Sequence, residues 1–218
     1  MRYIQKASEP ESFTEWKLRE TENSQPNWND LRKPEKPIVE DALLKEQGYI
    51  CCYCEIRVSK ENSHIEHLQP KSKYPDLLFE YGNLLASCQR GSEYPPPEPL
   101  HCGPHKDNWY DKHLLVSPLD PNCTDFFRFT EAGEILPTHD LSKATAASTT
   151  IEKLGLDVDK LRRLRNSAIE GVLDDKFDEL TETDKHKLIQ YFDRPDENGQ
   201  YQEFCSALIY LLKRNLPA

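Results

Sequence analysis

The stretch that decides the fold runs from residue 51 to residue 106 and is rich in metal-ligand residue types: Cys51-Cys52-Tyr53-Cys54-Glu55, His64-Ile65-Glu66-His67-Leu68-Gln69-Pro70-Lys71-Ser72, Tyr81-Gly82-Asn83-Leu84, Cys88 and Cys102-Gly103-Pro104-His105-Lys106. These residues suffice for two metal sites of different chemistry. Four thiolates can close a tetrahedral zinc site, because zinc favours soft sulfur ligands and a closed shell leaves no position for catalysis. The Glu, His and Asn side chains are harder donors, and they suit a hydrated catalytic cation with an open face.

The predicted zinc ligands are Cys51, Cys54, Cys88 and Cys102. The first two have the two-residue spacing of a zinc knuckle, whereas the second two are separated by thirteen residues that include a Pro-rich segment over 91–99. We expect that segment to be an extended, inserted loop. Alternatively, Cys88 is a small buried hydrophobe and Cys102 is incidental. No ligand role is expected for the remaining thiols, Cys52, Cys123 and Cys205.

Consecutive Glu66 and His67 point to phosphodiester hydrolysis. At the end of a short strand, neighbouring side chains face opposite sides, so the carboxylate can bind a metal ion while the imidazole faces a water molecule. An isolated Glu-His pair is usually a surface accident, but this pair lies between the two thiol pairs. Its position favours a catalytic role.

Composition limits the class of protein. The chain has 218 residues and a formal net charge of −10, which argues against a broad basic face for nucleic acid, since such binding relies on Lys and Arg displacing counterions. A divalent cation and a basic partner subunit would supply the missing positive charge. The start of the chain has no apolar leader and no apolar run has membrane-spanning length. We therefore expect a cytoplasmic protein, away from membranes, with its seven cysteines reduced or metal-bound.

The flanking regions differ in character. Residues 1–37 are polar and interrupted by prolines, which predicts an N-terminal arm with little independent structure. A helix is expected over 38–47 with Gly48 as its stop signal, and a hairpin over 126–136 that turns at Gly133. Helix formers dominate from about residue 141, with an apolar stripe between Leu161 and Leu180 and helices over 183–193 and 200–215. The stripe belongs either to the chain's own core or to a partner-docking face.

Together the motifs in residues 38–137 resemble the zinc-stapled HNH endonuclease family, whose core is a ββα-metal finger. The closer resemblance is to the HNH nuclease subunit of Septu-type anti-phage systems and of their retron-associated relatives, where Cys-x-Tyr-Cys-Glu and Ile-Glu-His-x-x-Pro-Lys-Ser occur together. Pro118-Leu119-Asp120-Pro121 and Phe127-x-Phe129 also suit that subfamily. The resemblance implies an α+β fold: a zinc-stapled HNH domain with a small hairpin over 38–137 and a mostly helical C-terminal region over 138–218.

The resemblance also implies roles for individual residues. His67 would be the general base, Glu66 and His105 would hold one Mg²⁺ or Mn²⁺ ion, Asn83 would tether the loop and orient His67, and Lys106 would meet a phosphate.

The last metal ligand departs from the family pattern. In many members the third metal-site residue directly follows the final zinc cysteine, where this chain has Gly103. His101 and Asn108 are therefore alternatives to His105. His64 is either a strand residue that pairs across the finger or part of the site.

By this resemblance the chain is a metal-dependent endonuclease, with DNA the favoured substrate, that acts in prokaryotic antiviral defence beside an ABC/SMC-like ATPase subunit. Two alternatives remain open on the residues alone. One is a non-catalytic, zinc-stapled binding or adaptor subunit, and the other is a cytosolic scaffold whose helical half docks a partner. Low sequence preference is expected, because no helix rich in Arg, Asn and Gln is visible to read base edges.

Overall fold

The computed structural model describes residues 1–23, 26–89, 99–173 and 180–216. The longer elements in these ranges are α1 (Glu11–Asn23), α2 (Glu35–Glu46), β1 (Ser63–His67), β2 (Leu84–Cys88), α3 (Cys102–Lys106), β3 (Phe127–Phe129), β4 (Ile135–Pro137), α4 (Leu141–Leu154), α5 (Asp159–Glu170), α6 (Glu182–Phe192) and α7 (Cys205–Arg214). Single 3₁₀ turns occur at Pro75–Leu77, Tyr81–Asn83 and Cys123–Phe126. The fold class is therefore mixed α+β, as the sequence predicts.

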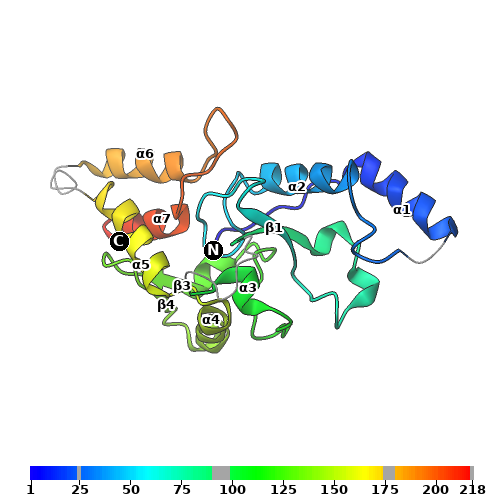
Figure 1. Ribbon diagram of the computed structural model, residues 1–218. Helices are drawn as coiled ribbons and strands as arrows, with labels where there is room; N and C mark the ends of the chain where they lie inside the picture. Colours follow the sequence, from blue (N-terminus) through cyan, green and yellow to red (C-terminus); the bar gives the residue numbers. More distant parts are fainter. Residues whose placement is uncertain (24–25, 90–98, 174–179, 217–218) are drawn as a thin grey trace.

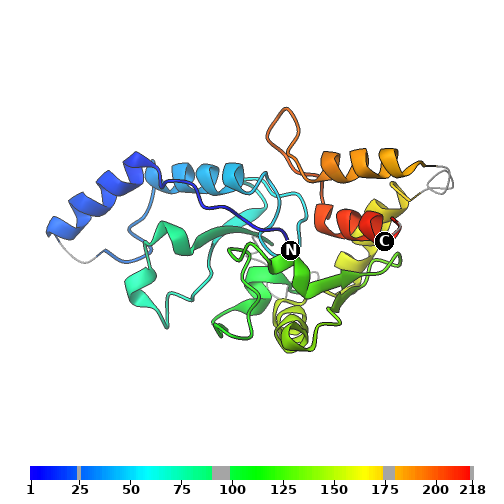
Figure 2. The same cartoon turned by 180° about the vertical axis from the view of Figure 1, so that it is seen from behind.

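The centre of the molecule is the antiparallel pair β1 and β2, with α3 packed beside them (Figure 1). His67 pairs with Leu84 and Ser63 with Cys88, so the five residues of each strand match along their whole length. All five residues of β2 are buried. A strand covered on both faces has no alternation of polar and apolar residues, which explains its composition of Leu84-Leu85-Ala86-Ser87-Cys88. Helices α1 and α2 lie at one end of this centre and α5 to α7 at the other (Figures 1 and 2).

The N-terminal region contains more structure than the sequence suggests. Helix α1 buries Phe13 and Trp16, which are 0% and 4% exposed, and the Trp16 ring packs edge-on against Phe79 with centroids 5.0 Å apart. Upstream of the helix, the Ile4 amide donates to the carbonyl of Pro118 over 2.8 Å. The expected N-terminal arm therefore contains a helix over residues 11–23, and two aromatic residues three positions apart attach this helix to a surface contributed from elsewhere. Whether the arm has little independent structure stays a prediction. The domain boundary at residue 37 stays a prediction.

Helix α2 confirms the predicted helix over 38–47, and Gly48 follows it with φ +59°, a left-handed conformation that ends helices. The hairpin of β3 and β4 is also confirmed, with Phe129 paired to Ile135 and Gly133 at φ +79° in the turn. The predicted helices over 183–193 and 200–215 correspond to α6 and α7.

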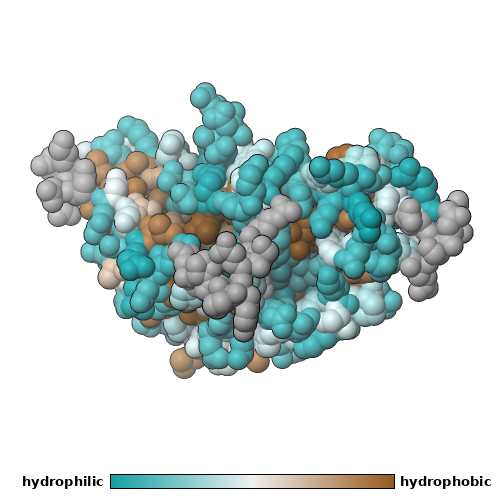
Figure 3. Space-filling view, viewed as in Figure 1, coloured by the Kyte–Doolittle hydropathy of each residue, from teal (hydrophilic) through white to brown (hydrophobic). Residues whose placement is uncertain are grey.

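The apolar stripe between Leu161 and Leu180 mostly faces inward. Leu161 and Ile169 of α5 are 0% and 1% exposed, whereas Leu164 is 43% exposed. Phe177 of the stripe and residues 91–98 of the expected inserted loop lie outside the described residues. In the view of Figure 3 the surface is mainly hydrophilic, and hydrophobic residues gather towards the end formed by α5 to α7. No helix in the described ranges is both long enough and apolar enough to cross a membrane.

Candidate metal centre and active site

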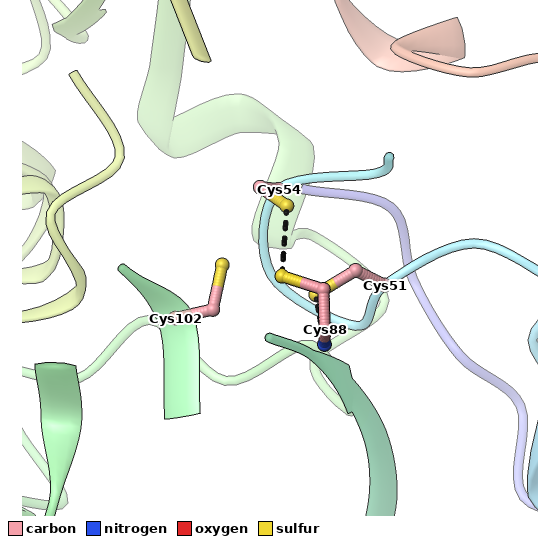
Figure 4. A group of neighbouring side chains, drawn as sticks. All are labelled: Cys51, Cys54, Cys88 and Cys102. Carbon is pink, nitrogen blue, oxygen red and sulfur yellow. Dashed lines mark hydrogen bonds between the residues drawn. The ribbon is translucent and has the colours of Figure 1, made fainter. Parts of the chain in front are cut away.

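Four buried cysteines converge from three separate segments of the chain. Cys51 and Cys54 lie in the turn that follows α2, Cys88 ends β2 and Cys102 begins α3. Their sulfur atoms all lie within 4.8 Å of one another (Figure 4), and the Sγ atoms of Cys54 and Cys88 are 3.7 Å apart. Four sulfurs at the usual zinc–sulfur distance of about 2.3 Å around one ion would be about 3.8 Å apart. Among the described residues, this is the group of three or more His, Cys, Asp and Glu side chains that could hold a metal ion.

Local backbone geometry presents the first two sulfurs. The amide of Glu55 donates to the carbonyl of Cys51 over 3.1 Å, and Glu55 has φ +66°, so the chain closes a tight turn. The Cys88 amide donates to the Cys51 Sγ over 3.4 Å. Burial opposes ionisation of Cys51 most strongly, but the neighbouring thiols outweigh it and hold the pKa of Cys51 well below its ordinary value. A thiolate is therefore favoured within the group, as metal binding requires.

The other three thiols, Cys52, Cys123 and Cys205, lie outside this group although they are buried. His101 lies beside it: its Nδ1 is 3.2 Å from the Sγ of Cys102 and 3.6 Å from that of Cys88. This buried ring therefore contacts the thiol site.

Glu66 is the buried acid of β1. Its Oε1 lies 2.8 Å from the ammonium of Lys106 and accepts a hydrogen bond from the Tyr53 hydroxyl over 3.3 Å. Its Oε2 lies 3.4 Å from Nε2 of His64. Burial alone would raise the pKa of this carboxyl, but the His64 ring and the Lys106 ammonium outweigh burial and hold the pKa below its ordinary value. Glu66 is thus a carboxylate at neutral pH.

His67, the last residue of β1, faces the other side of the strand. Its Nε2 lies 3.0 Å from the carbonyl of Leu78, so the ring donates from this nitrogen and a neutral imidazole keeps Nδ1 as its acceptor. The ring packs edge-on against Trp28 with centroids 4.4 Å apart. Burial of the ring lowers the pKa of His67, and the charge of Lys71 lowers it further. The hydrogen bond to Leu78 raises the pKa but is outweighed, so the pKa lies below its ordinary value. The neutral form, which can accept a proton, is therefore favoured.

Asn83 fastens the segment between β1 and β2. Its Oδ1 accepts from the amide of Gln69 over 2.8 Å, and its Nδ2 donates to the carbonyls of Gln69 and Leu77 over 3.0 and 3.3 Å. Its own carbonyl accepts from the amide of Leu68 over 2.9 Å. Because Leu78, the partner of the His67 ring, directly follows Leu77, these bonds hold the carbonyl that orients the ring.

The structure does not bring His105 to Glu66. His105 is exposed, and its Cγ lies 3.5 Å from where a side chain at Gly155 would begin, at the end of α4. Lys106, the next residue, is 1% exposed and takes the position beside Glu66. Asn108 is also exposed and accepts a hydrogen bond from the Ser72 hydroxyl.

Sequence reasoning missed two aromatic residues in the site. Tyr53 lies between Cys51 and Cys54 and reaches Glu66, and Trp28, which contacts His67, belongs to the region expected to be an arm with little independent structure. The two Trp residues of this polar, Pro-rich region, Trp16 and Trp28, are the available sequence signal, because such a region has no other reason to carry large apolar side chains.

The chain is similar over most of its length to two proteins of known name. One is "Retron Vc95 putative HNH endonuclease" of Vibrio cholerae serotype O1 biovar El Tor, 31% identical over 162 residues that cover 72% of this chain and 75% of that protein. The other is "Retron Ec83 putative HNH endonuclease" of Escherichia coli, 28% identical over 207 residues that cover 78% and 79%. A stretch of 57 residues, 25% of this chain and 22% of the relative, is 42% identical to "Septu protein PtuB" of Bacillus thuringiensis. No family model matches the chain.

Proposed function

Because the chain belongs to the HNH endonuclease family, with relatives from retron and Septu systems, we propose that it hydrolyses phosphodiester bonds of nucleic acid as a nuclease of anti-phage defence. DNA is the favoured substrate. The observation that carries the proposal is the pair formed by Glu66 and His67 at the end of β1, two neighbours that face opposite sides of one strand. A carboxylate on one side and a neutral imidazole on the other match the two tasks of metal-assisted hydrolysis.

The proposed proton acceptor is Nδ1 of His67. Because Nε2 donates to the Leu78 carbonyl, only Nδ1 of a neutral ring can take a proton from an attacking water molecule. Asn83 supports this geometry by fixing the chain at Leu77. General-base assistance of this kind is worth on the order of 10²- to 10⁴-fold in rate.

A divalent cation, Mg²⁺ or Mn²⁺, would be held by Glu66 and would stabilise charge on the phosphate and on the leaving oxygen. The carboxylate suits such an ion, because it is ionised and one of its oxygens faces away from Lys106. Products with 5′-phosphate and 3′-hydroxyl ends are expected.

We also propose that the four clustered thiols hold a structural zinc ion, which would make β1, β2 and α3 a ββα-metal finger. The thiols join the turn after α2, the end of β2 and the start of α3. Of these segments, β2 pairs with β1, which carries Glu66, and α3 carries Lys106. Zinc would therefore preserve the active site without taking part in the reaction.

An ABC/SMC-like ATPase subunit is the proposed partner, in the cytoplasm where the nucleic acid lies. The support is the match to a Septu protein together with the net charge of −10, which leaves delivery of the substrate to a second protein. A non-catalytic adaptor is the second candidate, favoured by one observation: Lys106 already neutralises Glu66, as expected of a purely structural ion pair.

The test is cleavage of plasmid, single-stranded DNA and tRNA by the purified zinc-loaded chain, with Mg²⁺, Mn²⁺ or EDTA, and with or without the ATPase. Divalent-dependent cutting that His67→Ala abolishes would support the nuclease. The control His186→Ala removes an exposed ring on α6 and should cut normally. If wild type with the ATPase cuts none of the substrates under any of these conditions, the adaptor reading replaces the nuclease.

A further inference from the structure

His64 and Glu66 point to the same side of β1, because they are two positions apart on a strand. The Nε2 of His64 and the Oε2 of Glu66 are 3.4 Å apart. Two donor atoms that share one ion at bond lengths of about 2.1 Å are about 3.0 Å apart in octahedral geometry and about 3.4 Å apart in tetrahedral geometry. The separation of the two atoms is within about 0.4 Å of the octahedral value, so a small side-chain rotation would let both bind a single octahedral cation.

Gly103 of α3 provides the space in which these atoms lie. A Cβ at this position would be 2.6 Å from Oε2 of Glu66 and also 2.6 Å from Nε2 of His64, closer than real Cβ atoms approach. The backbone of Gly103 is not in the left-handed region, so its conformation does not require glycine. The residue is small because two donor side chains from β1 occupy the volume that its own side chain would fill.

The surroundings leave these two donor atoms available to an ion. Lys106 and Tyr53 engage Oε1 of Glu66, and they fix the carboxylate so that Oε2 faces His64. The His64 side chain is 28% exposed, whereas that of Glu66 is 9% exposed. Thus solvent and its cations reach the pair from the His64 side.

We propose that His64 and Glu66, rather than His105 and Glu66, are the protein ligands of the catalytic cation, and that Gly103 keeps the space for them. The catalytic role of this cation rests on the proposed function. The cation site itself is inferred from the spacing of the two donor atoms. Imidazole and carboxylate together favour a first-row transition ion such as Mn²⁺ over Mg²⁺, which prefers oxygen ligands. Water and a phosphate oxygen would complete the shell.

The test is titration of the zinc-loaded full chain with Mn²⁺, followed by the electron paramagnetic resonance signal of the free ion. His64→Ala should weaken the tightest site at least about tenfold, since removal of even an outer partner of a metal ligand costs that much. Glu66→Gln should abolish the site. His105→Ala and the surface control His186→Ala should bind as wild type does. Thermal unfolding checks that each variant is folded.

Gly103 gives a second, independent test. Gly103→Ala should also weaken Mn²⁺ binding, because its methyl group displaces both donors. Binding that survives His64→Ala, or that depends on His105, would overturn the inference.

The two proposals fail in different ways. If the wild type binds Mn²⁺ through His64 but cuts no nucleic acid with the ATPase present, the cation site stands and the nuclease does not. If the wild type cuts and His64→Ala keeps both cutting and Mn²⁺ affinity, the nuclease stands and this cation site does not.

Discussion

The buried ion pair between Lys106 and Glu66 gives the sharpest test of how the site is held. The two charged atoms are 2.8 Å apart and the side chains are 1% and 9% exposed, so water screens them little. Lys106→Met keeps most of the side-chain volume but leaves the carboxylate with only Tyr53 and His64 as partners. Removal of one partner of a buried pair typically costs about 3–5 kcal/mol, because the remaining charge stays desolvated.

Urea unfolding at fixed free zinc concentration measures this cost. With a slope of about 2 kcal/mol per molar urea, a loss of about 4 kcal/mol lowers the midpoint by about 2 M. Lys106→Met combined with Glu66→Gln should recover most of the loss, since it removes the unpaired charge as well. The matched control is Lys187→Met, which breaks a surface pair with Asp184 at 3.3 Å, where the lysine is 71% exposed. Such surface pairs contribute about 0–1 kcal/mol.

The reasoning is refuted if Lys106→Met shifts the midpoint no more than Lys187→Met does. It is also refuted if the double variant is no more stable than the single one, because the cost would then come from lost packing or from the lost hydrogen bond of Lys106 to the His67 carbonyl, and not from the stranded charge.

Four further outcomes are expected. His67→Ala should slow cleavage of one plasmid substrate by at least about a hundredfold under conditions where urea unfolding shows that the variant is still folded. The acid limb of the pH profile of the cleavage rate should lie below pH 6.5. Burial lowers the pKa of His67 from that ordinary value, so the ring stays neutral and active down to lower pH. An acid limb above pH 6.5 would contradict this. A strong chelator should lower the melting temperature and expose the four clustered thiols to alkylation, which mass spectrometry can count. Cys123 should react more slowly, because burial raises its pKa to about 12. Trp16→Ala should cost about 3–5 kcal/mol in urea unfolding, and a negligible effect would show that the Trp16 contacts do not hold α1 on the rest of the chain.

The sequence predicted those parts of the fold that depend on local pattern. Helix α2 with its stop at Gly48, the turn at Gly133 and the four-thiol group follow from spacing and from conformations that only certain residues adopt. A short strand ending at His67 was also within reach of sequence reasoning, since β1 spans Ser63–His67.

What the sequence did not predict depends on contacts between distant residues. The packing of Trp28 on His67 joins positions 39 apart in the chain, and α1 is held by Phe79. Likewise, the sequence Gly103-Pro104-His105-Lys106 does not predict which of its side chains points towards Glu66. That choice follows from the helical turn of α3, which points Lys106 inward and leaves His105 exposed.

The acidic charge of the chain is compatible with a phosphodiester substrate once charges are counted locally. Lys106 balances Glu66, so this carboxylate presents no net negative charge to a phosphate. Beside His67, the ammonium groups of Lys36 and Lys71 lie 5.9 and 5.6 Å from the centre of the Trp28 ring. The charges of Glu66 and Lys106 cancel each other. A divalent ion bound to the carboxylate would then keep its full positive charge for the substrate phosphate. The overall charge of −10 therefore limits long-range attraction and non-specific binding, while the two lysines near the Trp28 ring supply positive charge close to His67. An acidic protein with positive charge near its site suits a nuclease that receives its substrate from a partner and does not search for it alone.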